Sequence, residues 1–349
     1  MDSRTSIGTI AQWNAEVALA AGWNVTVVAK HVSPSLRSHV EHLPLYIPPR
    51  VHAVQWSAAR ATVRRAIGRR KFDVLHVHQS QLADMSDVMQ CHYLVRGAQQ
   101  NDCLERPQTV RSAFMRAQLE VIMRLEDRYA LRWPASSATV LFASDLLRRE
   151  YERAYGPFNG AAVLSPPAPR FHPPSADERM RARERWASEA RSDEIVVGFL
   201  GGTDFRKGFD RVVQGVASSS RLFLLAVGDG AQTYDARLGR RQTWAGHIDD
   251  VNDMLAACDV VAVPSRFEPY GLVCLEAAAR AVPIVATAEV GALDDILRWK
   301  AGVCWDPSRP FEHAVELALR TCDSDRSRSL VDASSTENAA SRLLSVYDR

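Results

Sequence analysis

Short apolar runs alternate with amphipathic segments along most of this chain, and this alternation constrains the fold more than any other feature of the sequence. Apolar runs of this kind predict strands that are buried on both faces of a parallel sheet. The amphipathic segments between them predict the crossover helices of βαβ units. With 349 residues, the chain fits two α/β domains of roughly 150 residues each.

The alternation occurs in two rounds, one in each half of the chain. In the first half we expect strands at 25–29, 73–78, 87–91 and 139–142, and helices at 14–21, 109–132 and 145–155. In the second half we expect strands at 195–200, 222–227, near 244, at 260–263 and at 284–286. Helices are expected there at 207–218, shortly after 227, and at 249–257, 271–280 and 310–320. Each round predicts one doubly wound sheet.

A proline-rich stretch separates the two rounds. Residues 165–174 contain five prolines, which break helices and disfavour central strands, and a charged segment follows. Parallel sheets bind ligands at the carboxyl ends of their strands, so two such domains are expected to face a shared cleft. The predicted parts are a Rossmann-like domain over 1–165, a linker with a charged segment over 166–193, a second Rossmann-like domain over 194–335, and a helix over 336–349 that can return to the first domain.

The composition excludes several classes of protein. Hydrophobic residues make up 46% and charged residues 24%, and no run approaches the roughly 20 apolar residues that span a bilayer. The N-terminus lacks the apolar core of a signal peptide. The six cysteines show neither a CxxC pair nor metal-ligand spacing. We therefore expect buried, reduced thiols, no metal site and a cytoplasmic location.

The net charge of +2 hides a basic first half, because residues 1–165 contain 20 Lys and Arg against 14 Asp and Glu. A basic helix can dock on anionic lipid, where each cation adds roughly 1 kcal/mol, or it can be a solvated face. Nucleic-acid binding is disfavoured because aromatic residues are not interleaved with the cations. The excess gathers in one predicted helix at Arg60, Arg64, Arg65, Arg69, Arg70 and Lys71.

Two glutamates flank the predicted N-terminus of a helix in the second half. Glu268 lies between the strand 260–263 and Gly271, and Glu276 lies inside the helix. A helix N-terminus presents unpaired N–H groups that suit a phosphate, and Gly271 lets a ligand approach the backbone closely. Both carboxylates can face one site, where each can accept hydrogen bonds from sugar hydroxyls. The alternative is that Glu268 caps the helix and Glu276 is solvated.

The segment 265–279, Ser-x-x-Glu-Pro-Tyr-Gly-Leu-Val-x-Leu-Glu-Ala-x-Ala, resembles the signature of retaining GT-B glycosyltransferases of glycosyltransferase family four. The resemblance implies a GT-B fold, in which two doubly wound Rossmann-like domains face an interdomain cleft. The N-terminal domain would bind the acceptor and the C-terminal domain the nucleotide-sugar. Glu276 would then bind the ribose hydroxyls, Glu268 the donor hexose, and the amides of Gly271 and Leu272 the distal phosphate.

A glycine turn with two cations lies upstream. Gly201 and Gly202 follow the strand 195–200, and Arg206 and Lys207 close the loop. Such a turn can hold a diphosphate, and the alternative is a surface turn with two solvated bases. The loop resembles that of bacterial lipopolysaccharide-core glucosyltransferases, although Gly202 stands where the family usually has arginine. The resemblance implies that Arg206 and Lys207 neutralise the leaving diphosphate in place of a divalent metal.

Weaker matches complete the predicted site. Gly246 and His247 follow a strand of the second sheet, and the resemblance places the nucleotide base beside them. An ordinary turn is the alternative there, as it is for residues 228–230. His92 follows the strand 87–91, near where many family members have a histidine beside the transferred sugar. A lone histidine after a strand is more often structural.

The N-terminus departs from the family pattern. Family members open with an apolar strand, a glycine-rich loop and a helix. Here residues 6–9, with Gly8, stand where the loop is expected, and no residues remain for the first strand. Either the start lies downstream of the natural one or the N-terminal sheet lacks a strand. Because that exposes ladder groups and apolar side chains, we expect a poorly soluble or weakly active protein.

Together these features predict a retaining, metal-independent hexosyltransferase. By resemblance, the donor is a UDP- or GDP-hexose, and no cofactor is expected. The acceptor is a sugar or lipid-linked saccharide of bacterial surface polysaccharide or lipopolysaccharide synthesis. The basic helix leaves peripheral attachment to the inner face of the membrane open. The alternative function is a catalytically impaired GT-B protein that serves as a binding or assembly subunit. A dehydrogenase is disfavoured because no Gly-x-Gly-x-x-Gly follows a strand.

Overall fold

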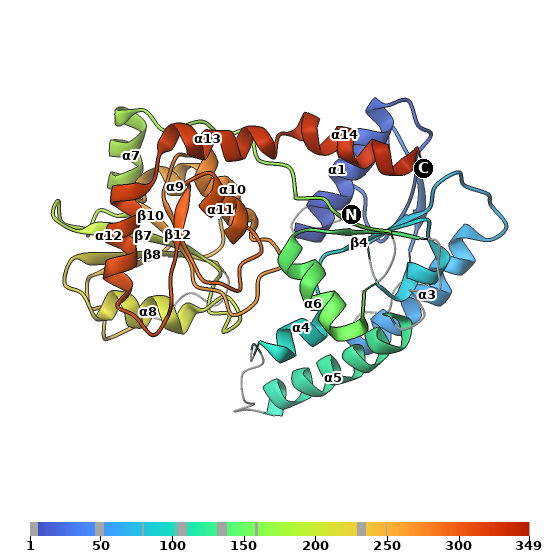
Figure 1. Ribbon diagram of the computed structural model, residues 1–349, viewed down its shortest axis with the longest axis horizontal. Helices are drawn as coiled ribbons and strands as arrows, with labels where there is room; N and C mark the ends of the chain where they lie inside the picture. Colours follow the sequence, from blue (N-terminus) through green and yellow to red (C-terminus); the bar gives the residue numbers. More distant parts are fainter. Residues whose placement is uncertain are drawn as a thin grey trace. The chain divides into compact units, whose positions relative to one another are not determined.

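The computed structural model describes residues 6–45, 52–78, 80–101, 103, 110–130, 138–157, 160–228, 235–248 and 250–348. The chain divides into two compact units (Figure 1). Unit 1 contains residues 1–99, 106–166 and 337–349, and unit 2 contains residues 100–105 and 167–336. All strand pairs in both units are parallel, so the prediction of two α/β domains with parallel sheets is confirmed.

Unit 2 is built on one six-stranded sheet with the order β12-β11-β10-β7-β8-β9. The order reverses at β7, as it does in doubly wound sheets. Four of its strands have the bounds that their apolar runs predict, because fully buried strands are continuous apolar segments. The strands are β7 (Ile195–Leu200), β8 (Leu222–Val227), β9 (Gln242–Trp244), β10 (Val260–Val263), β11 (Ile284–Ala286) and β12 (Gly302–Cys304).

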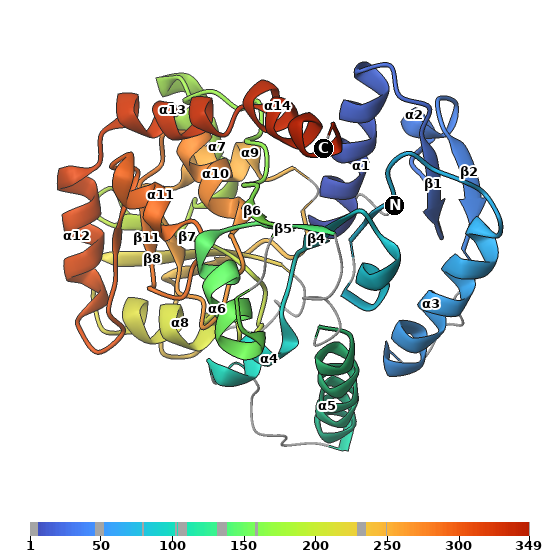
Figure 2. The same cartoon turned by 45° about the vertical axis from the view of Figure 1, so that its right-hand side comes forward.

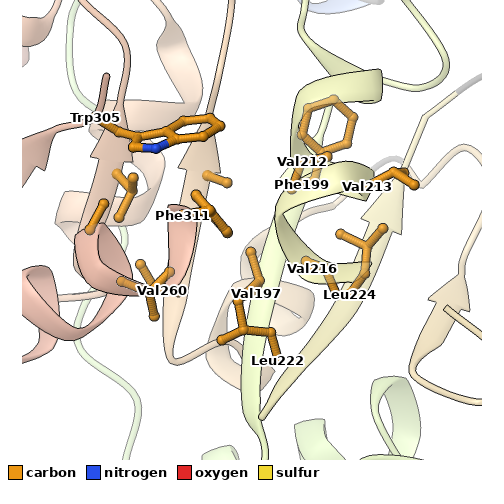
Figure 3. Packing of buried hydrophobic residues seen from close by; sticks show 14 of the residues in the cluster. Val197, Phe199, Val212, Val213, Val216, Leu222, Leu224, Val260, Trp305 and Phe311 are labelled. Carbon is orange, nitrogen blue, oxygen red and sulfur yellow. The ribbon is translucent and has the colours of Figure 1, made fainter. Parts of the chain in front are cut away.

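Helices cover this sheet and supply the second half of its core. On α8, Val212, Val213 and Val216 are all fully buried and belong to the same cluster as the strand residues Val197 and Leu224 (Figure 3). Each such side chain contributes roughly 1.5–3 kcal/mol on burial. The helices are α7 (Ala176–Trp186), α8 (Phe209–Ala217), α9 (Asn252–Ala257), α10 (Leu272–Ala279), α11 (Leu293–Arg298), α12 (Phe311–Thr321) and α13 (Ser324–Ala333).

The charged segment that the sequence assigned to the linker contains helix α7. Ser175 caps its N-terminus, accepting a hydrogen bond from the Glu178 amide, while the Glu178 carboxylate accepts one from the Ser175 amide. Arg179 and Arg183 of this helix both form ion pairs with Asp259, which follows α9. These ion pairs therefore hold α7 against the rest of unit 2.

Unit 1 contains two separate sheets. A two-stranded sheet pairs β1 with β2, and a four-stranded sheet has the order β3-β4-β5-β6. The strands are β1 (Thr26–Ala29), β2 (Glu41–Pro44), β3 (His76–Val77), β4 (Val88–Cys91), β5 (Thr139–Phe142) and β6 (Ala161–Val163). The helices are α1 (Ser6–Ala20), α2 (Pro34–Arg37), α3 (His52–Ile67), the 3₁₀ helix η1 (Ser80–Met85), α4 (Val95–Gln100), α5 (Val110–Ala130), α6 (Asp145–Tyr155) and α14 (Thr336–Tyr347).

Two predictions for the N-terminal segment are wrong. The helix expected at 14–21 begins at Ser6, so Gly8 lies in the first turns of α1 and not in a glycine-rich loop. Apolar residues at Ile7, Ile10 and Ala11 extend the helical face, and this periodicity outweighs the roughly 1 kcal/mol that a helical glycine costs.

The strand expected at 73–78 is also shorter than predicted. Only His76 and Val77 form β3, and they pair with β4 on one side alone. A parallel strand that lacks a neighbour on one side has inter-strand hydrogen bonds on its other side only, and this limits the length of the strand.

The C-terminal helix α14 belongs to unit 1. Its buried Leu343 and Val346 pack with Val17 of α1 and Val88 of β4. The Tyr347 hydroxyl lies 2.7 Å from Nδ1 of His76. The last helix thus completes the core of the N-terminal unit. In the part of the chain that the structure describes, no helix has both the length and the apolar character required to cross a bilayer.

Candidate donor site

The predicted phosphate loop begins directly after β7. The amides of Gly201 and Gly202 both donate to the carbonyl of Val227 at the end of β8. Gly202 has a φ of +61°, and the backbone of Gly228 approaches it so closely that a Cβ on Gly228 would lie 2.3 Å from the Gly202 nitrogen. Glycine is thus required at these positions for a steric reason that the sequence did not show. These hydrogen bonds hold the loop at the ends of β7 and β8, and they fix the position from which the side chains of Arg206 and Lys207 extend.

The second predicted element is the N-terminus of α10. Gly271 caps this helix with a φ of +98°, a conformation that favours glycine. A Cβ there would lie 3.3 Å from both Glu268 and Cys274, so the turn is also tightly packed. Leu272 is the first helical residue, and its amide is one of the unpaired donors that a helix start offers.

The two elements meet at Glu268. Its carboxylate is largely buried and accepts hydrogen bonds from the guanidinium of Arg206, at 3.2 Å, and from the ammonium of Lys207. Arg206 also donates to the carbonyl of Phe267 at 3.0 Å. The two cations from the first motif and the carboxylate from the second therefore form one cluster, as a shared site requires.

Glu276 belongs to the same electrostatic environment. Burial raises the pKa of this carboxyl to about 7, and the nearby positive charge of Lys207 partly opposes that rise. Lys207 thus acts on both glutamates of the motif. A carboxyl with a pKa in this range changes its charge near neutral pH, and such perturbed groups gather at functional sites.

Main-chain contacts hold the two loops together. The Arg266 amide donates to the carbonyl of Arg206 at 2.8 Å. Gly208, at a φ of +78°, lies so close to the next loop that a Cβ would stand 2.0 Å from the carbonyl oxygen of Pro264. Arg211 donates to that same carbonyl at 3.1 Å. The separation of cations and carboxylates is therefore set by backbone packing.

The sequence analysis did not identify the residues whose side chains connect these two loops. Arg266 forms a bidentate ion pair with Asp210 of α8, and its guanidinium stacks on Phe205, 3.6 Å from the ring centre. Arg266 lies inside the segment 265–279 of the sequence analysis, and Asp210 lies in the helix expected at 207–218. The opposite charges of Arg266 and Asp210, 56 positions apart, were the signal in the sequence that could have indicated this ion pair.

The turn predicted beside the nucleotide base is partly described. Gly246 has a φ of +67°, and its carbonyl accepts a hydrogen bond from the Gly228 amide at 2.9 Å. This bond connects the turn to the phosphate loop. His247 is exposed. Asp229 and Gly230, which the sequence analysis also considered, lie outside the described residues.

His92 and Gly8 belong to unit 1. His92 follows β4 and lies against His78, with 2.8 Å between its Nε2 and the Nδ1 of His78. The rings of His76 and His78 are stacked with 4.6 Å between their centres. Burial lowers the pKa of His92 to about 4 and that of His76 to about 3, and it holds the pKa of His78 well below its usual value. The predicted lone histidine is thus part of a cluster of three.

This cluster makes acid stability a testable property of the chain. The unfolded chain protonates histidine near pH 6.5, whereas His76 and His92 take up protons only near pH 3 and 4 in the folded unit. Above about pH 6.5 these groups do not affect folding, and below it the free energy of unfolding falls by up to about 1.4 kcal/mol per pH unit for each histidine. Urea unfolding from about pH 7.5 to about pH 5 should show this decline. In His92→Gln the slope should be shallower, and an unchanged slope would contradict the assignment.

Residues 180–330 match the sequence profile of the family described as Glycosyl transferases group 1. This part of the chain is a group 1 glycosyltransferase domain. The group 1 domain lies within unit 2 and contains the whole cluster around Glu268. The prediction of a group 1 glycosyltransferase is thus confirmed for residues 180–330.

Two curated relatives align with parts of the chain. The lipopolysaccharide core biosynthesis glycosyltransferase LpsE of Rhizobium meliloti is 33% identical over 120 residues, which cover 32% of this chain and 35% of that protein. A GDP-mannose-dependent alpha-(1-6)-phosphatidylinositol dimannoside mannosyltransferase of Mycobacterium tuberculosis is 29% identical over 204 residues, 54% of this chain and 50% of that protein. The chain spans half or less of the length of these two relatives.

Solved structures resemble the whole chain. WaaG, a glycosyltransferase involved in lipopolysaccharide biosynthesis, superimposes with a TM-score of 0.74 at 18% identity and covers 97% of this chain and 96% of its own. Anabaena HepE, solved in complex with UDP-glucose, gives a TM-score of 0.69 at 17% identity, with 97% and 95% covered. These likenesses confirm the predicted GT-B fold around the group 1 domain.

Among residues 6–348, outside the gaps in the described ranges, no group of three or more His, Cys, Asp and Glu side chains is arranged to hold a metal ion. The polar groups that converge in the group 1 domain are the cations Arg206 and Lys207 and the carboxylates Glu268 and Glu276.

Proposed function

We propose that this chain transfers a hexose from a nucleoside-diphosphate sugar to an acceptor hydroxyl, with retention of configuration and without a divalent metal. The observation that carries this proposal is the shared carboxylate of Glu268, which joins Arg206 and Lys207 to the N-terminal end of α10. The group 1 profile and the fold shared with HepE, which was solved in complex with UDP-glucose, add support.

The diphosphate would lie between the phosphate loop and α10. The amides of Gly271 and Leu272 and the positive end of the helix dipole would bind the distal phosphate. Arg206 and Lys207 would leave Glu268 and neutralise the charge that develops on the leaving diphosphate in the transition state. The backbone of both loops is held by packing, so the side chains of the two cations are the groups that move from Glu268 to the diphosphate.

The two glutamates would then bind the sugars. Glu268, released from its cations, would accept hydrogen bonds from hydroxyls of the hexose, and Glu276 would bind the ribose. We propose displacement on the same face, in which the leaving phosphate oxygen accepts the proton of the acceptor hydroxyl as the new glycosidic bond forms.

The pKa of Glu276 gives this role a pH dependence. The carboxyl has a pKa of about 7, so it is mostly neutral at pH 6 and mostly ionised at pH 8. A neutral carboxyl accepts ribose hydrogen bonds less strongly, so affinity for a nucleotide-sugar should rise about tenfold from about pH 6 to pH 8. The diphosphate diester keeps its charge over this range. Calorimetric titration checks this, and Glu276→Gln should bind weakly with no such pH dependence.

Thermal stabilisation tests the proposed function directly. UDP, GDP, UDP-hexoses and GDP-hexoses would each be added to the chain and its unfolding followed. A ligand at 100 times its Kd stabilises the folded state by about 2.7 kcal/mol. We expect one nucleotide class to stabilise the chain and Glu276→Ala to lose that effect. Glu184→Ala, an exposed carboxylate on α7, is the matched control and should keep it. No shift with any nucleotide would contradict the proposal.

A catalytically impaired binding protein is the second candidate. The split sheet of unit 1, with two and four strands, is the observation that favours it. Such a protein would still be stabilised by nucleotide-sugars through unit 2. Release of nucleoside diphosphate from the stabilising nucleotide-sugar distinguishes the two, because only the enzyme turns the donor over.

We propose that the acceptor is a saccharide of bacterial surface polysaccharide or lipopolysaccharide synthesis. We also propose that the protein is located in the cytoplasm and is attached peripherally to the membrane. The support is the relationship to LpsE and WaaG and the basic surface of α3. Arg60 of that helix forms an ion pair with Asp84, whereas Arg64 and Arg65 are exposed.

Vesicle binding tests the attachment. Replacing Arg64, Arg65 and Arg69 by alanine should weaken binding to anionic vesicles up to about 100-fold, since each cation near the surface contributes roughly 1 kcal/mol. Cosedimentation measures this. The control is the triple variant Arg181→Ala, Arg298→Ala and Arg320→Ala, which removes the same charge from exposed positions of unit 2. Equal binding by both variants would exclude docking through α3.

A further inference from the structure

A cavity of unit 2 lies between helices α8 and α12. The two helices pack on the same face of the six-stranded sheet and lie side by side (Figure 2). The cavity has a volume of about 480 Å³, which is within the range of about 300–1,000 Å³ that small-molecule sites occupy. Neither the two cations nor the two carboxylates of the donor site line it. The cavity is therefore a separate place in which unit 2 can bind a ligand.

Two parts of unit 2 form the walls of this cavity. One wall is a face of α8 and its C-terminal end, where Arg211, Gln214 and Ser218 follow the spacing of a single helix face. The other wall is the connection from β12 to the first residues of α12. Gly215 lets the two walls approach, because a Cβ there would lie 2.7 Å from the Cβ of Phe311. The walls are thus held in place by a tightly packed contact between the two helices.

Arg211 is a cation of this cavity without a carboxylate partner. It is partly buried and donates to the main-chain carbonyls of Pro264 and Ser265, at 3.1 Å and 3.4 Å. Among the residues that the structure describes, no carboxylate forms an ion pair with it. Burial lowers the pKa of Arg211, and the positive charge of nearby Arg266 lowers it further. An anion in the cavity would oppose both effects.

The acidic residues that line the cavity already have cationic partners. Asp210 accepts the two hydrogen bonds of the Arg266 guanidinium, at 2.7 Å and 2.6 Å. Glu312 forms an ion pair with Arg221, at 3.5 Å, and Arg221 does not line the cavity. These two carboxylates are thus compensated by other arginines.

Arg309 supplies a second cation from the opposite wall. Its side chain is 81% exposed, and its Nε lies 4.0 Å from the carboxylate of Asp306. An exposed ion pair at this separation contributes little, so Arg309 can turn to an anion in the cavity at small cost. Arg211 and Arg309 together give the cavity a positive charge that its own acidic residues do not balance.

Uncharged groups line much of the remaining surface. Gln214 and Ser308 are exposed and can exchange hydrogen bonds with hydroxyl groups. Pro307 and Pro310 are also exposed and offer apolar carbon surface on the same wall as Ser308. An inorganic anion would use only the cations and leave most of the volume empty. A ligand with an anionic end and a hydroxylated ring uses both parts of the cavity.

We propose that this cavity, which we name the α8–α12 pocket, binds a sugar phosphate. The phosphate accepts charge-assisted hydrogen bonds from Arg211 and Arg309, whose planar guanidinium groups match its geometry. The sugar hydroxyls bind Gln214 and Ser308, and the carbon side of the ring contacts the two prolines. The pocket is thus a second anion site of unit 2, and it does not depend on the proposed transfer reaction.

Calorimetric titration tests the α8–α12 pocket. The probes are glucose 6-phosphate, inorganic phosphate and glucose. We expect the hexose phosphate to bind at least about tenfold more tightly than inorganic phosphate, and glucose alone not to bind. Arg309→Ala should weaken binding of the hexose phosphate at least about tenfold, because it removes a charge-assisted hydrogen bond. The matched control is Arg320→Ala, an exposed arginine of α12 that does not line the pocket, and it should leave the affinity unchanged.

Two further variants locate the bound phosphate. Gln214→Glu keeps the size of an exposed side chain and places a negative charge in the pocket, so it should weaken binding at least about tenfold. Lys207→Met removes a cation of the donor site and should leave the affinity for the hexose phosphate unchanged. Circular dichroism verifies that the variants fold.

Three results would overturn the proposal. The first is that the hexose phosphate does not bind or binds no more tightly than inorganic phosphate, because the sugar would then contribute nothing. The second is that Arg309→Ala and Arg320→Ala bind it equally well. The third is that Lys207→Met abolishes binding, because the phosphate would then lie in the donor site. None of these results bears on stabilisation by nucleotides, so the two proposals fail independently.

Discussion

Replacing Lys207 by methionine is expected to lower kcat/KM for donor turnover by about 100- to 1000-fold. The ammonium of Lys207 reaches Glu268 and acts on the charge of Glu276, so it lies at the point where the two motifs meet. In the proposed reaction it stabilises negative charge on the leaving diphosphate, and this interaction is strongest in the transition state. Release of nucleoside diphosphate from the stabilising nucleotide-sugar is the measurement.

The matched control is Lys300→Met. Lys300 is an exposed lysine of the same unit, and its replacement changes the net charge equally. We expect it to leave turnover unchanged. If Lys207→Met and Lys300→Met had similar small effects, Lys207 would have no part in the chemistry. A loss confined to KM, with kcat retained, would restrict Lys207 to ground-state binding.

Gly208→Ala is expected to lower the free energy of unfolding of unit 2 by about 2–5 kcal/mol. The left-handed conformation at a φ of +78° is unfavourable for alanine, and the new Cβ would stand 2.0 Å from the Pro264 carbonyl oxygen. Left-handed strain adds about 1–2 kcal/mol and forced overpacking about 1–3 kcal/mol. Denaturant unfolding measures the loss, which should be accompanied by weaker nucleotide binding as the two loops are pushed apart.

Gly239→Ala is the control for this prediction. Gly239 also has a left-handed backbone, with a φ of +55°, but no atom lies within 4 Å of the position of its Cβ. Gly239→Ala therefore introduces the strain of the left-handed backbone without a steric clash. We expect it to lower the free energy of unfolding by about 1–2 kcal/mol. Equal destabilisation by the two substitutions would mean that the contact between the loops contributes nothing to stability.

The fold was predictable wherever burial is complete. β7, β8, β10 and β11 were placed at their observed bounds because each is a continuous apolar run between turn residues. β2 (Glu41–Pro44) and β6 (Ala161–Val163) were missed, because their residues are partly exposed and the pattern of a buried strand is absent. α7 was missed because its face is held by ion pairs to Asp253 and Asp259 and not by an apolar stripe. Partners that lie far away in the sequence leave no local signal.

The features of the candidate site also divide into those that the sequence predicted and those that it did not. Arg206, Lys207, Glu268 and Gly271 were found because strand-to-helix turns carry recognisable residues at short spacing. The need for glycine at Gly208 was not found, because it arises from a carbonyl 56 positions away. The stacking of Arg266 on Phe205 was equally hidden. The chemistry of the site is encoded locally, whereas the geometry that holds it depends on the packing of two loops from different strands.

The pairing of Glu268 with Arg206 and Lys207 has a further consequence for turnover. In the ligand-free unit these cations already have an anionic partner, so free phosphate or sulfate in the cell must displace a carboxylate before it can bind there. In the proposed reaction, the same carboxylate would be available again after the hexose has left, and it could take back the cations from the remaining nucleoside diphosphate. Glu268 would then compete with bound anions from within the protein, which would lower inhibition by free anions and shorten the time that the product occupies the site.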